Sequence, residues 1–276
     1  MRLAIVGRGL IGGSVELRAR SLGWRVRWHD PADPQSRPLA EAIAKAQTIV
    51  VAAPLGATLQ ILERLAGSEA RLVMDVASVK VPVVAAGRGV HGFVATHPMA
   101  GKERGGVENA DATLFEGRPW AYVPSGDGDA DTRARDFIAA MGAIAFAVDA
   151  DAHDRALART SHVPQLAGYA LAEAIGELDA ELRESASGPV AQELLRIAKS
   201  DRALWDEIFA ANAGNVAAEA RALAARLVRM AASLEAGGGP SSLDSGRFAP
   251  DARDDKSGSR FAPDARDDKG GKKNKR

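Results

Sequence analysis

The first half of the chain alternates short apolar runs with stretches of helical spacing. Leu3-Ala4-Ile5-Val6 is fully apolar and ends in glycine, which is typical of a central parallel strand buried on both faces. Similar runs predict further strands at residues 26–28, 48–53, 71–75, 92–95, 120–123 and 143–148. Helices are predicted between them, at residues 39–46 and 58–66 and in a stretch that ends near residue 21. This alternation predicts an α/β fold, a Rossmann-type doubly wound sheet that is mostly parallel.

The pattern changes after about residue 149, where no β-like run follows. Segments rich in Ala, Leu, Glu and Arg carry apolar residues at helical spacing over residues 154–178, 190–199 and 204–234. This spacing predicts an all-α second domain. Its last helix, read as about 30 residues long, exceeds what a small monomer covers, so we expect a partner subunit beside it.

The end of the chain repeats itself after a glycine-rich stretch at residues 237–239. The ten residues 247–256, Arg-Phe-Ala-Pro-Asp-Ala-Arg-Asp-Asp-Lys, recur intact at residues 260–269. Two such copies are too few for a stacked repeat fold, and their composition is typical of disordered segments. We therefore predict a disordered tail over residues 237–276.

Composition narrows the function further. The 276 residues are 46% hydrophobic, and 36 basic side chains balance 36 acidic ones, which argues against a nucleic-acid or membrane partner. The chain has no cysteine, so disulfides, thiolate nucleophiles and Cys-ligated zinc are excluded, and no His/Asp/Glu cluster has the spacing of metal ligands. No secretory signal precedes the first strand and no apolar run reaches the length of about 18 residues that spans a bilayer. We expect a cytoplasmic protein.

The first strand runs into a glycine motif. Gly7, Gly9 and Gly12 form G-x-G-x-x-G between a buried strand and a helix, the arrangement that binds a dinucleotide pyrophosphate at a helix N-terminus. Asp30 ends the second strand, where a carboxylate accepts hydrogen bonds from ribose hydroxyls and favours NAD over NADP. The nearby Arg25 and Arg27 keep NADP open. The expected cofactor-binding residues are Gly7, Arg8, Gly9, Leu10, Ile11, Gly12, Asp30, Ala53, Pro54 and Ser78.

Two further side chains follow predicted strands and should reach the same sheet edge. Ser78 comes after the fourth strand, and His97 lies on what we interpret as a loop after the run 92–95. A hydroxyl and an imidazole beside a nicotinamide suit removal of a proton from an alcohol while hydride leaves. A lone loop histidine is more often structural, and a Ser-His hydrolase is a rival interpretation, although Ser78 lacks the G-x-S-x-G elbow.

Seven motifs in order resemble those of the prephenate/arogenate (cyclohexadienyl) dehydrogenases of tyrosine biosynthesis, over roughly residues 1 to 235. They are Gly7-Arg8-Gly9-Leu10-Ile11-Gly12-Gly13-Ser14, Asp75-Val76-Ala77-Ser78-Val79-Lys80, His97-Pro98-Met99-Ala100-Gly101, Phe115-Glu116-Gly117-Arg118, Ser161-His162-Val163-Pro164, Arg196-Ile197-Ala198-Lys199-Ser200-Asp201 and the stretch from Trp205 to Asn212. The resemblance implies NAD(P)-dependent oxidative decarboxylation of prephenate to 4-hydroxyphenylpyruvate, of arogenate to tyrosine, or of both. It also implies a homodimer formed through the helical domain.

The resemblance assigns roles to single residues. His97 is expected to accept the hydroxyl proton, Ser78 to hydrogen-bond the substrate hydroxyl and Arg196 to bind a substrate carboxylate. His162 and Gln165 are expected near the substrate. Family members often show Ser-His-Leu-Pro-His where this chain has Ser-His-Val-Pro-Gln, and a neutral amide suits either substrate, so prephenate and arogenate both stay open.

Three histidines receive no catalytic role. His29 is expected beside the ribose site, and His91 and His153 at surface boundaries. The predicted domains are residues 1–150 for the dinucleotide, 151–236 for substrate binding and dimerisation, and the tail. Two rival functions stay open: a related NAD(P)-dependent hydroxy-acid dehydrogenase or imine reductase, and a non-catalytic NAD sensor.

Overall fold

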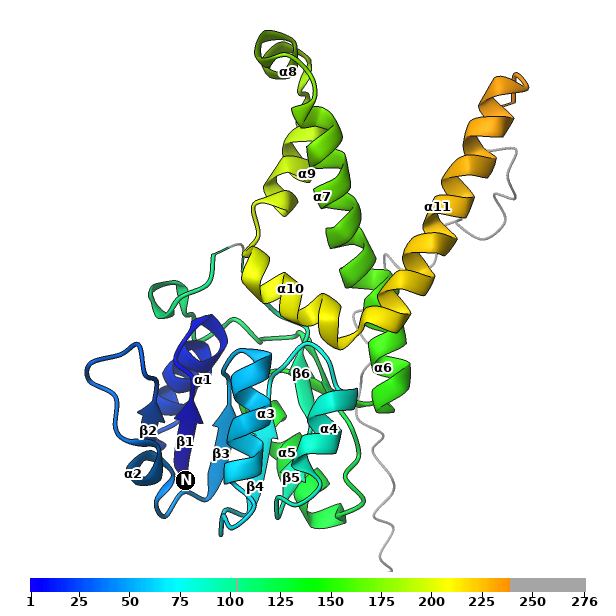
Figure 1. The fold of residues 1–276 in the computed structure, drawn as a ribbon. Coiled ribbons are helices and arrows are strands. Elements are labelled where there is room, and N and C mark those ends of the chain that lie inside the picture. The colour runs from blue at the N-terminus through cyan, green and yellow to red at the C-terminus, as the bar shows by residue number, and fades with distance from the viewer. Residues whose placement is uncertain (103, 239–276) are drawn as a thin grey trace, which may run out of the picture. The chain divides into compact units, whose positions relative to one another are not determined.

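The computed structural model describes residues 1–102 and 104–238 (Figure 1). The chain divides into two units, residues 1–224 and residues 225–276, and all of the site described below lies in the first. The predicted tail lies outside the described residues from residue 239 onward.

A parallel five-stranded sheet organises the N-terminal part, as the sequence predicts. Its strands run in the order β2-β1-β3-β4-β5. The bounds are β1 Arg2–Val6, β2 Arg25–His29, β3 Thr48–Val51, β4 Leu72–Asp75 and β5 Phe93–Val94. The chain order reverses beside β1, between β1 and β3, so the carboxyl ends of these strands form the crevice where α/β sheets bind ligands.

Helices cover both faces of this sheet (Figure 1). They are α1 Leu10–Ser21, α2 Leu39–Ile43, α3 Leu55–Arg64, α4 Val81–Gly87 and α5 Gly128–Ala140. Leu3 and Ile5 of β1 pack into the core that contains α1 and α5, whereas Ala4 and Val6 pack into the core that contains α3 and α4. The strand is apolar throughout because its alternate residues enter two different cores.

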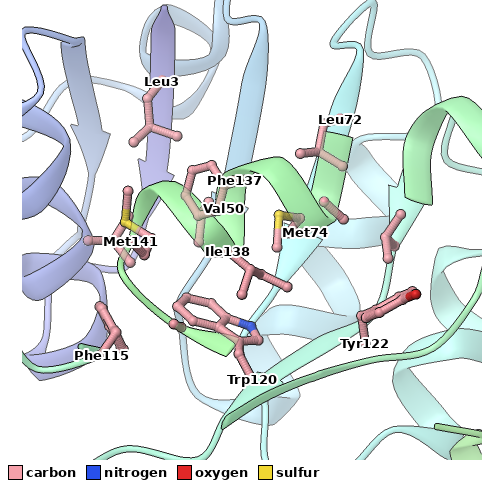
Figure 2. Close-up of a cluster of buried hydrophobic side chains, with 14 of the residues drawn as sticks. Leu3, Val50, Leu72, Met74, Phe115, Trp120, Tyr122, Phe137, Ile138 and Met141 are labelled. Atoms are coloured by element: carbon pink, nitrogen blue, oxygen red, sulfur yellow. The ribbon is translucent and has the colours of Figure 1, made fainter. Parts of the chain in front are cut away.

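The core on the α5 side is the larger cluster of bulky side chains. Figure 2 shows Phe137 and Ile138 of α5 beside Leu3, Val50 and Met74 of the strands. Trp120 is fully buried at the base of this cluster and lies 4.9 Å, ring centre to ring centre, from Phe115. Asp127 caps α5 by accepting hydrogen bonds from the backbone N–H groups of residues 129 and 130.

A second sheet, of order β6-β7-β8, carries His97. Its strands are β6 Thr96–Pro98, β7 Pro119–Tyr122 and β8 Ile144–Ala147, and a short 3₁₀ helix, η1 Val107–Asn109, lies between the first two. His97 therefore lies in a strand, opposite Ala121 in an antiparallel pair, and the interpretation of a loop histidine is wrong. A three-residue strand that ends in proline is too short to show a period of two.

The C-terminal part is helical, as predicted. Its elements are α6 Ala150–Leu157, the π-helix η2 Ala158–His162, α7 Val163–Gly176, α8 Ala180–Ala186, α9 Pro189–Ala198, α10 Arg202–Ala211 and α11 Ala213–Glu235. Helices α7 and α9 approach closely because Gly168 leaves room for Ile197. No helix among residues 1–102 and 104–238 is long and apolar enough to cross a membrane.

The prediction of a single last helix of about 30 residues is wrong. The chain leaves helical geometry at Asn212, which separates α10, 10 residues long, from α11, 23 residues long. The Asn212 side chain is buried and donates a hydrogen bond from Nδ2 to the main-chain carbonyl of Asp154, at 2.7 Å. The interruption is thus stabilised by a contact between segments far apart in the sequence, which helical spacing cannot reveal.

One ion pair is buried in the centre of the fold. Lys80 Nζ contacts an Asp75 carboxylate oxygen and donates to the carbonyl of Thr96, and both charged side chains are inaccessible to solvent. Asp75 also accepts the backbone N–H of Thr96, at 2.9 Å. These bonds join the end of β4, the start of α4 and the start of β6.

We predict that Lys80→Met lowers the free energy of unfolding by about 3–5 kcal/mol, because it leaves the Asp75 carboxylate buried without its counter-charge. Urea unfolding followed by circular dichroism measures this loss. Lys102→Met is the control, because the Lys102–Asp111 pair is exposed, with side chains 39% and 38% accessible, and exposed pairs contribute little. Equal unfolding midpoints for the two variants would contradict a structural role for the buried pair.

Candidate active site

The glycine loop has the geometry of a dinucleotide site. Gly7 has φ of +95°, and a Cβ there would lie 2.4 Å from the Ala52 carbonyl oxygen. A Cβ at Gly12 would lie 2.0 Å from the Gly7 carbonyl oxygen. A Cβ at Gly9 would meet nothing within 4 Å. The fold itself therefore requires glycine at 7 and 12, whereas the open space at Gly9 fits a ligand that approaches the backbone.

The predicted ribose-binding residue lies beside this loop. Asp30 accepts hydrogen bonds from the backbone N–H of Arg8, at 2.6 Å, and of Ala32, at 2.9 Å. A cavity of about 530 Å³ opens here. It is lined by Arg8, Gly9, Asp30, Ala32, Asp33, Pro34, Gln35, Gly106 and Val107. The residues expected to hold the adenosine end thus share one cavity.

The other expected cofactor residues follow the same sheet edge. Leu10 and Ile11 begin α1, and Ala53 and Pro54 follow β3 directly before α3. Arg25 and Arg27 line a different cavity, of about 460 Å³, with Trp24 and Trp28. They do not line the cavity of Asp30, so no arginine of β2 stands ready there for a 2′-phosphate.

His97 is joined to a second histidine and a carboxylate. His97 Nδ1 lies 3.0 Å from His153 Nε2, and His153 Nδ1 lies 2.7 Å from Asp154 Oδ1. The rings of His97 and His153 meet edge to face, 5.2 Å apart. Asp154 also accepts the backbone N–H groups of Lys80, at 2.7 Å, and Val81, at 2.9 Å.

His153 and Asp154 are the site residues that sequence reasoning missed. The expectation that His153 lies at a surface boundary is wrong, because His153 is only 2% exposed and Asp154 only 1%. Both lie in the middle of α6, far in sequence from β6. The local signal is a His-Asp pair in the first half of a capped helix, and nothing in the sequence shows that it faces residue 97.

Burial and neighbouring charge keep His97 neutral. Desolvation lowers the pKa of His97 well below the ordinary histidine value, and Lys80, His153 and His162 lower it further. Desolvation also lowers the pKa of His162, to about 4, although Asp154 opposes this effect. A histidine that is neutral at neutral pH has a free nitrogen that can accept a proton.

A π-helical turn positions His162. This turn, η2, ends at His162, whose Nδ1 lies 3.1 Å from Asn212 Nδ2. The His162 ring meets Trp205 edge to face at 6.1 Å. One turn further on, Gln165 donates from Nε2 to the carbonyl of Ile197, at 2.8 Å. The π-helical turn thus carries His162 and leads into the helix that carries Gln165, and turns of this kind are frequent at functional sites.

Among residues 1–102 and 104–238, the hydrogen bonds described for Ser78 and Arg196 do not include His97, His153 or Asp154. Ser78 is half-buried in the loop before α4, and its hydroxyl makes no hydrogen bond within the described part of the chain. Arg196 lies on α9, where its guanidinium pairs with Glu193 through Nε, at 2.8 Å, and Nη2, at 2.5 Å. The roles expected of these two residues remain proposals.

The arrangement can take a proton from a hydroxyl beside a bound dinucleotide. A neutral imidazole, an available hydroxyl and a glycine loop all follow strands whose carboxyl ends meet at one edge. Among residues 1–102 and 104–238, no group of three or more metal-ligating side chains could hold a metal ion.

Comparisons with known proteins match both halves of the chain. Residues 25–145 match the family described as prephenate dehydrogenase, nucleotide-binding domain, and residues 149–243 match prephenate dehydrogenase, dimerization domain. A probable prephenate dehydrogenase of Streptomyces niveus is 34% identical, with 92% of this chain and 74% of the relative covered. A cyclohexadienyl dehydrogenase of Zymomonas mobilis is 27% identical, with 76% and 80% covered.

A solved structure shows the same architecture. The prephenate dehydrogenase of Aquifex aeolicus, in complex with hydroxyphenyl propionate and NAD⁺, superposes with a TM-score of 0.77 at 25% identity. The superposition covers 86% of this chain and 91% of that one. The arogenate dehydrogenase of Synechocystis, at 21% identity and a TM-score of 0.73, shares the fold and covers 90% and 100% of the two chains.

The glycine loop generates a prediction that separates folding from binding. Gly12→Ala should lower the thermal unfolding midpoint strongly, because its Cβ meets backbone, whereas Gly9→Ala should leave the midpoint unchanged. Gly9→Ala should instead weaken NAD binding about tenfold or more, because the methyl group occupies the space of the pyrophosphate. Calorimetric titration measures the affinity. Normal NAD affinity in folded Gly9→Ala protein would show that the dinucleotide binds elsewhere.

Proposed function

The chain belongs to the prephenate dehydrogenase family, and we propose that it is an NAD-dependent dehydrogenase that oxidises and decarboxylates prephenate, arogenate or both in the synthesis of tyrosine. The observation that carries this proposal is the half-buried imidazole of His97, which follows β5 of the same parallel sheet whose carboxyl edge bears the glycine loop. NAD, when bound, supplies the acceptor for the hydride that leaves the substrate ring.

The residues of the chain bind the substrate and hold one proton. His97 accepts the proton of the ring hydroxyl through Nε2, the nitrogen that does not face His153. The Ser78 hydroxyl is available to hydrogen-bond the same substrate oxygen and orient it. Loss of the ring carboxylate as carbon dioxide then makes the ring aromatic, so the protein mainly positions groups rather than driving a difficult step.

Arg196 and Gln165 are the proposed contacts to the rest of the substrate. The planar guanidinium of Arg196 suits a carboxylate, which would replace Glu193 or share the guanidinium with it. Gln165 donates one of its two Nε2 hydrogens to the Ile197 carbonyl, which leaves Oε1 as an acceptor and the second Nε2 hydrogen as a donor for a substrate side chain. His162, fixed by Asn212 and Trp205, lies one turn before Gln165 on the same helical face.

We propose a homodimer formed through the helical domain. The hydrophobic cluster that joins the helices around η2 is small, and its buried side chains are Ala158, Val163 and Val216. Large apolar side chains lie exposed on the neighbouring helices, with Leu171 of α7 at 46% and Val190 of α9 at 77%. Apolar surface of this kind is typical of a subunit interface. We also propose a dinucleotide-binding domain over residues 1–150, a helical domain over residues 151–236 and a cytoplasmic location.

The proposed reaction predicts that His97→Asn loses turnover by about a hundredfold or more, because general-base catalysis contributes about 10²–10⁴-fold. NADH absorbance, followed with prephenate and with arogenate and with NAD and NADP in parallel, measures turnover and preference. NAD affinity should not change. His91→Asn is the matched control, because His91 is exposed. Wild-type turnover of a simple hydroxy acid, together with none of either cyclohexadienol, would contradict the proposed substrate class.

The proposed interface predicts that Leu171→Arg shifts the protein from dimer to monomer in sedimentation velocity, because a guanidinium replaces an apolar contact. Leu17→Arg is the control, since Leu17 is equally exposed, at 44%, on α1. A wild-type protein that sediments as a monomer at micromolar concentration would overturn the dimer.

A further inference from the structure

The nitrogen of His97 that faces away from the proposed substrate is engaged. Its Nδ1 lies 3.0 Å from His153 Nε2, and His153 Nδ1 lies 2.7 Å from Asp154 Oδ1. A chain of two imidazoles and one carboxylate thus runs from β6 into α6. General-base catalysis by His97 alone uses only the first of these three side chains.

The direction of these hydrogen bonds follows from Asp154. An ionised carboxylate only accepts hydrogen bonds, and Asp154 receives three, from His153 Nδ1 and from the backbone N–H groups of Lys80 and Val81. Burial acts to raise the pKa of Asp154, but these hydrogen bonds outweigh it and lower the pKa. His153 therefore carries its proton on Nδ1, and its Nε2 is an acceptor. His97 in turn donates from Nδ1, which leaves Nε2 as the free base.

The charged groups around His97, His153 and Asp154 are distributed unequally. Lys80, from the loop before α4, and His162, from η2, both disfavour a positive charge on His97. Asp75 of β4 is already paired with Lys80. Asp154 contacts His153 and not His97. A positive charge on His153 would lie in direct contact with the Asp154 carboxylate, whereas a positive charge on His97 would not.

We propose that His153 and Asp154 extend His97 into a closed proton store, which holds the proton of the substrate hydroxyl while hydride leaves and then returns it to the product oxygen. This inference rests on the proposed function, and it makes His153 and Asp154 positioning residues that act through His97.

The proton count balances without solvent. The substrate O–H bond breaks as a bond to His97 Nε2 forms, and the proton on His97 Nδ1 passes to His153 Nε2. His153 becomes an imidazolium beside the Asp154 carboxylate, and His97 is again neutral. After carbon dioxide leaves, the new ring oxygen is a phenolate, which takes back the proton from His97 Nε2 as the shifts reverse. The hydroxyl proton is thus borrowed, and none is released.

The burial of His153 and Asp154 fits a proton that is returned to the product and not released to water. His153 and Asp154 are 2% and 1% exposed, so a proton on His153 has no direct contact with water. An enzyme that had to release the proton would need a path outward from this pair. A store that returns the proton to its source needs none.

Histidine tautomers test the arrangement without turnover. The chain has five histidines, so the full-length protein labelled with ¹⁵N-histidine gives a simple two-bond proton–nitrogen spectrum. We expect His97 and His153 both as neutral Nδ1–H tautomers at neutral pH, with and without NAD, and His97→Asn and His153→Gln identify the two peaks. A neutral His97 that carries its proton on Nε2, or a His97 that is charged at neutral pH, would overturn the proposal.

Substitution of His153 separates storage from positioning. In His153→Gln the amide oxygen still accepts from His97 and the amide nitrogen still donates to Asp154, but the side chain cannot take a proton. We expect kcat to fall about tenfold or more with KM within about twofold. The acid limb of kcat/KM should move to lower pH, because the cation loses its place beside Asp154. Unchanged kcat, or a lower kcat with the limb at its original pH, would contradict storage.

The two experiments also separate this inference from the proposed function. If the wild-type protein turns over neither prephenate nor arogenate, the proposed function fails, and the tautomer spectrum still decides whether the chain of hydrogen bonds exists. If turnover is present but His97 carries its proton on Nε2, the proposed function stands and the proton store fails.

Discussion

The buried carboxylate of Asp154 is the contact on which the candidate site depends. Its oxygens accept hydrogen bonds from the start of α4 and from His153, and its main-chain carbonyl accepts one from Asn212. One residue therefore ties the loop that carries Ser78, the histidine pair and the break between α10 and α11. An uncompensated buried charge would be costly, so these donors must stay in place for the fold to be stable. The hydrogen bonds that stabilise the fold are consequently the same ones that set the geometry of the site.

The buried ammonium group of Lys80 disfavours a positive charge on His97. Paired with Asp75 and hydrogen-bonded to Thr96, it fixes the strand ends around His97 and also disfavours a proton there. An isolated imidazole under such a field would be a weak base. The partnership with His153 and Asp154 resolves this, because it offers the proton a second position beside a negative charge.

Local patterns in the sequence predict most of the fold and part of the site. Apolar runs mark β1, β3 and β4, and the glycine motif marks the cofactor loop, because in each case neighbouring residues determine the structure. His153 escapes prediction because its role depends on β6 and α6 coming together. The break at Asn212 escapes for the same reason, since its amide bonds to a residue in α6. Long-range partners leave no periodic signal in the chain.

The proposed reaction requires His97 Nε2 to face the hydroxyl that is oxidised. A crystal structure of the protein with NAD and a phenolic analogue of the substrate tests it most directly. We expect the ring oxygen within about 3.2 Å of His97 Nε2, with His97 Nδ1 still hydrogen-bonded to His153. A ring oxygen bound away from His97, with that nitrogen facing only protein atoms, would contradict it.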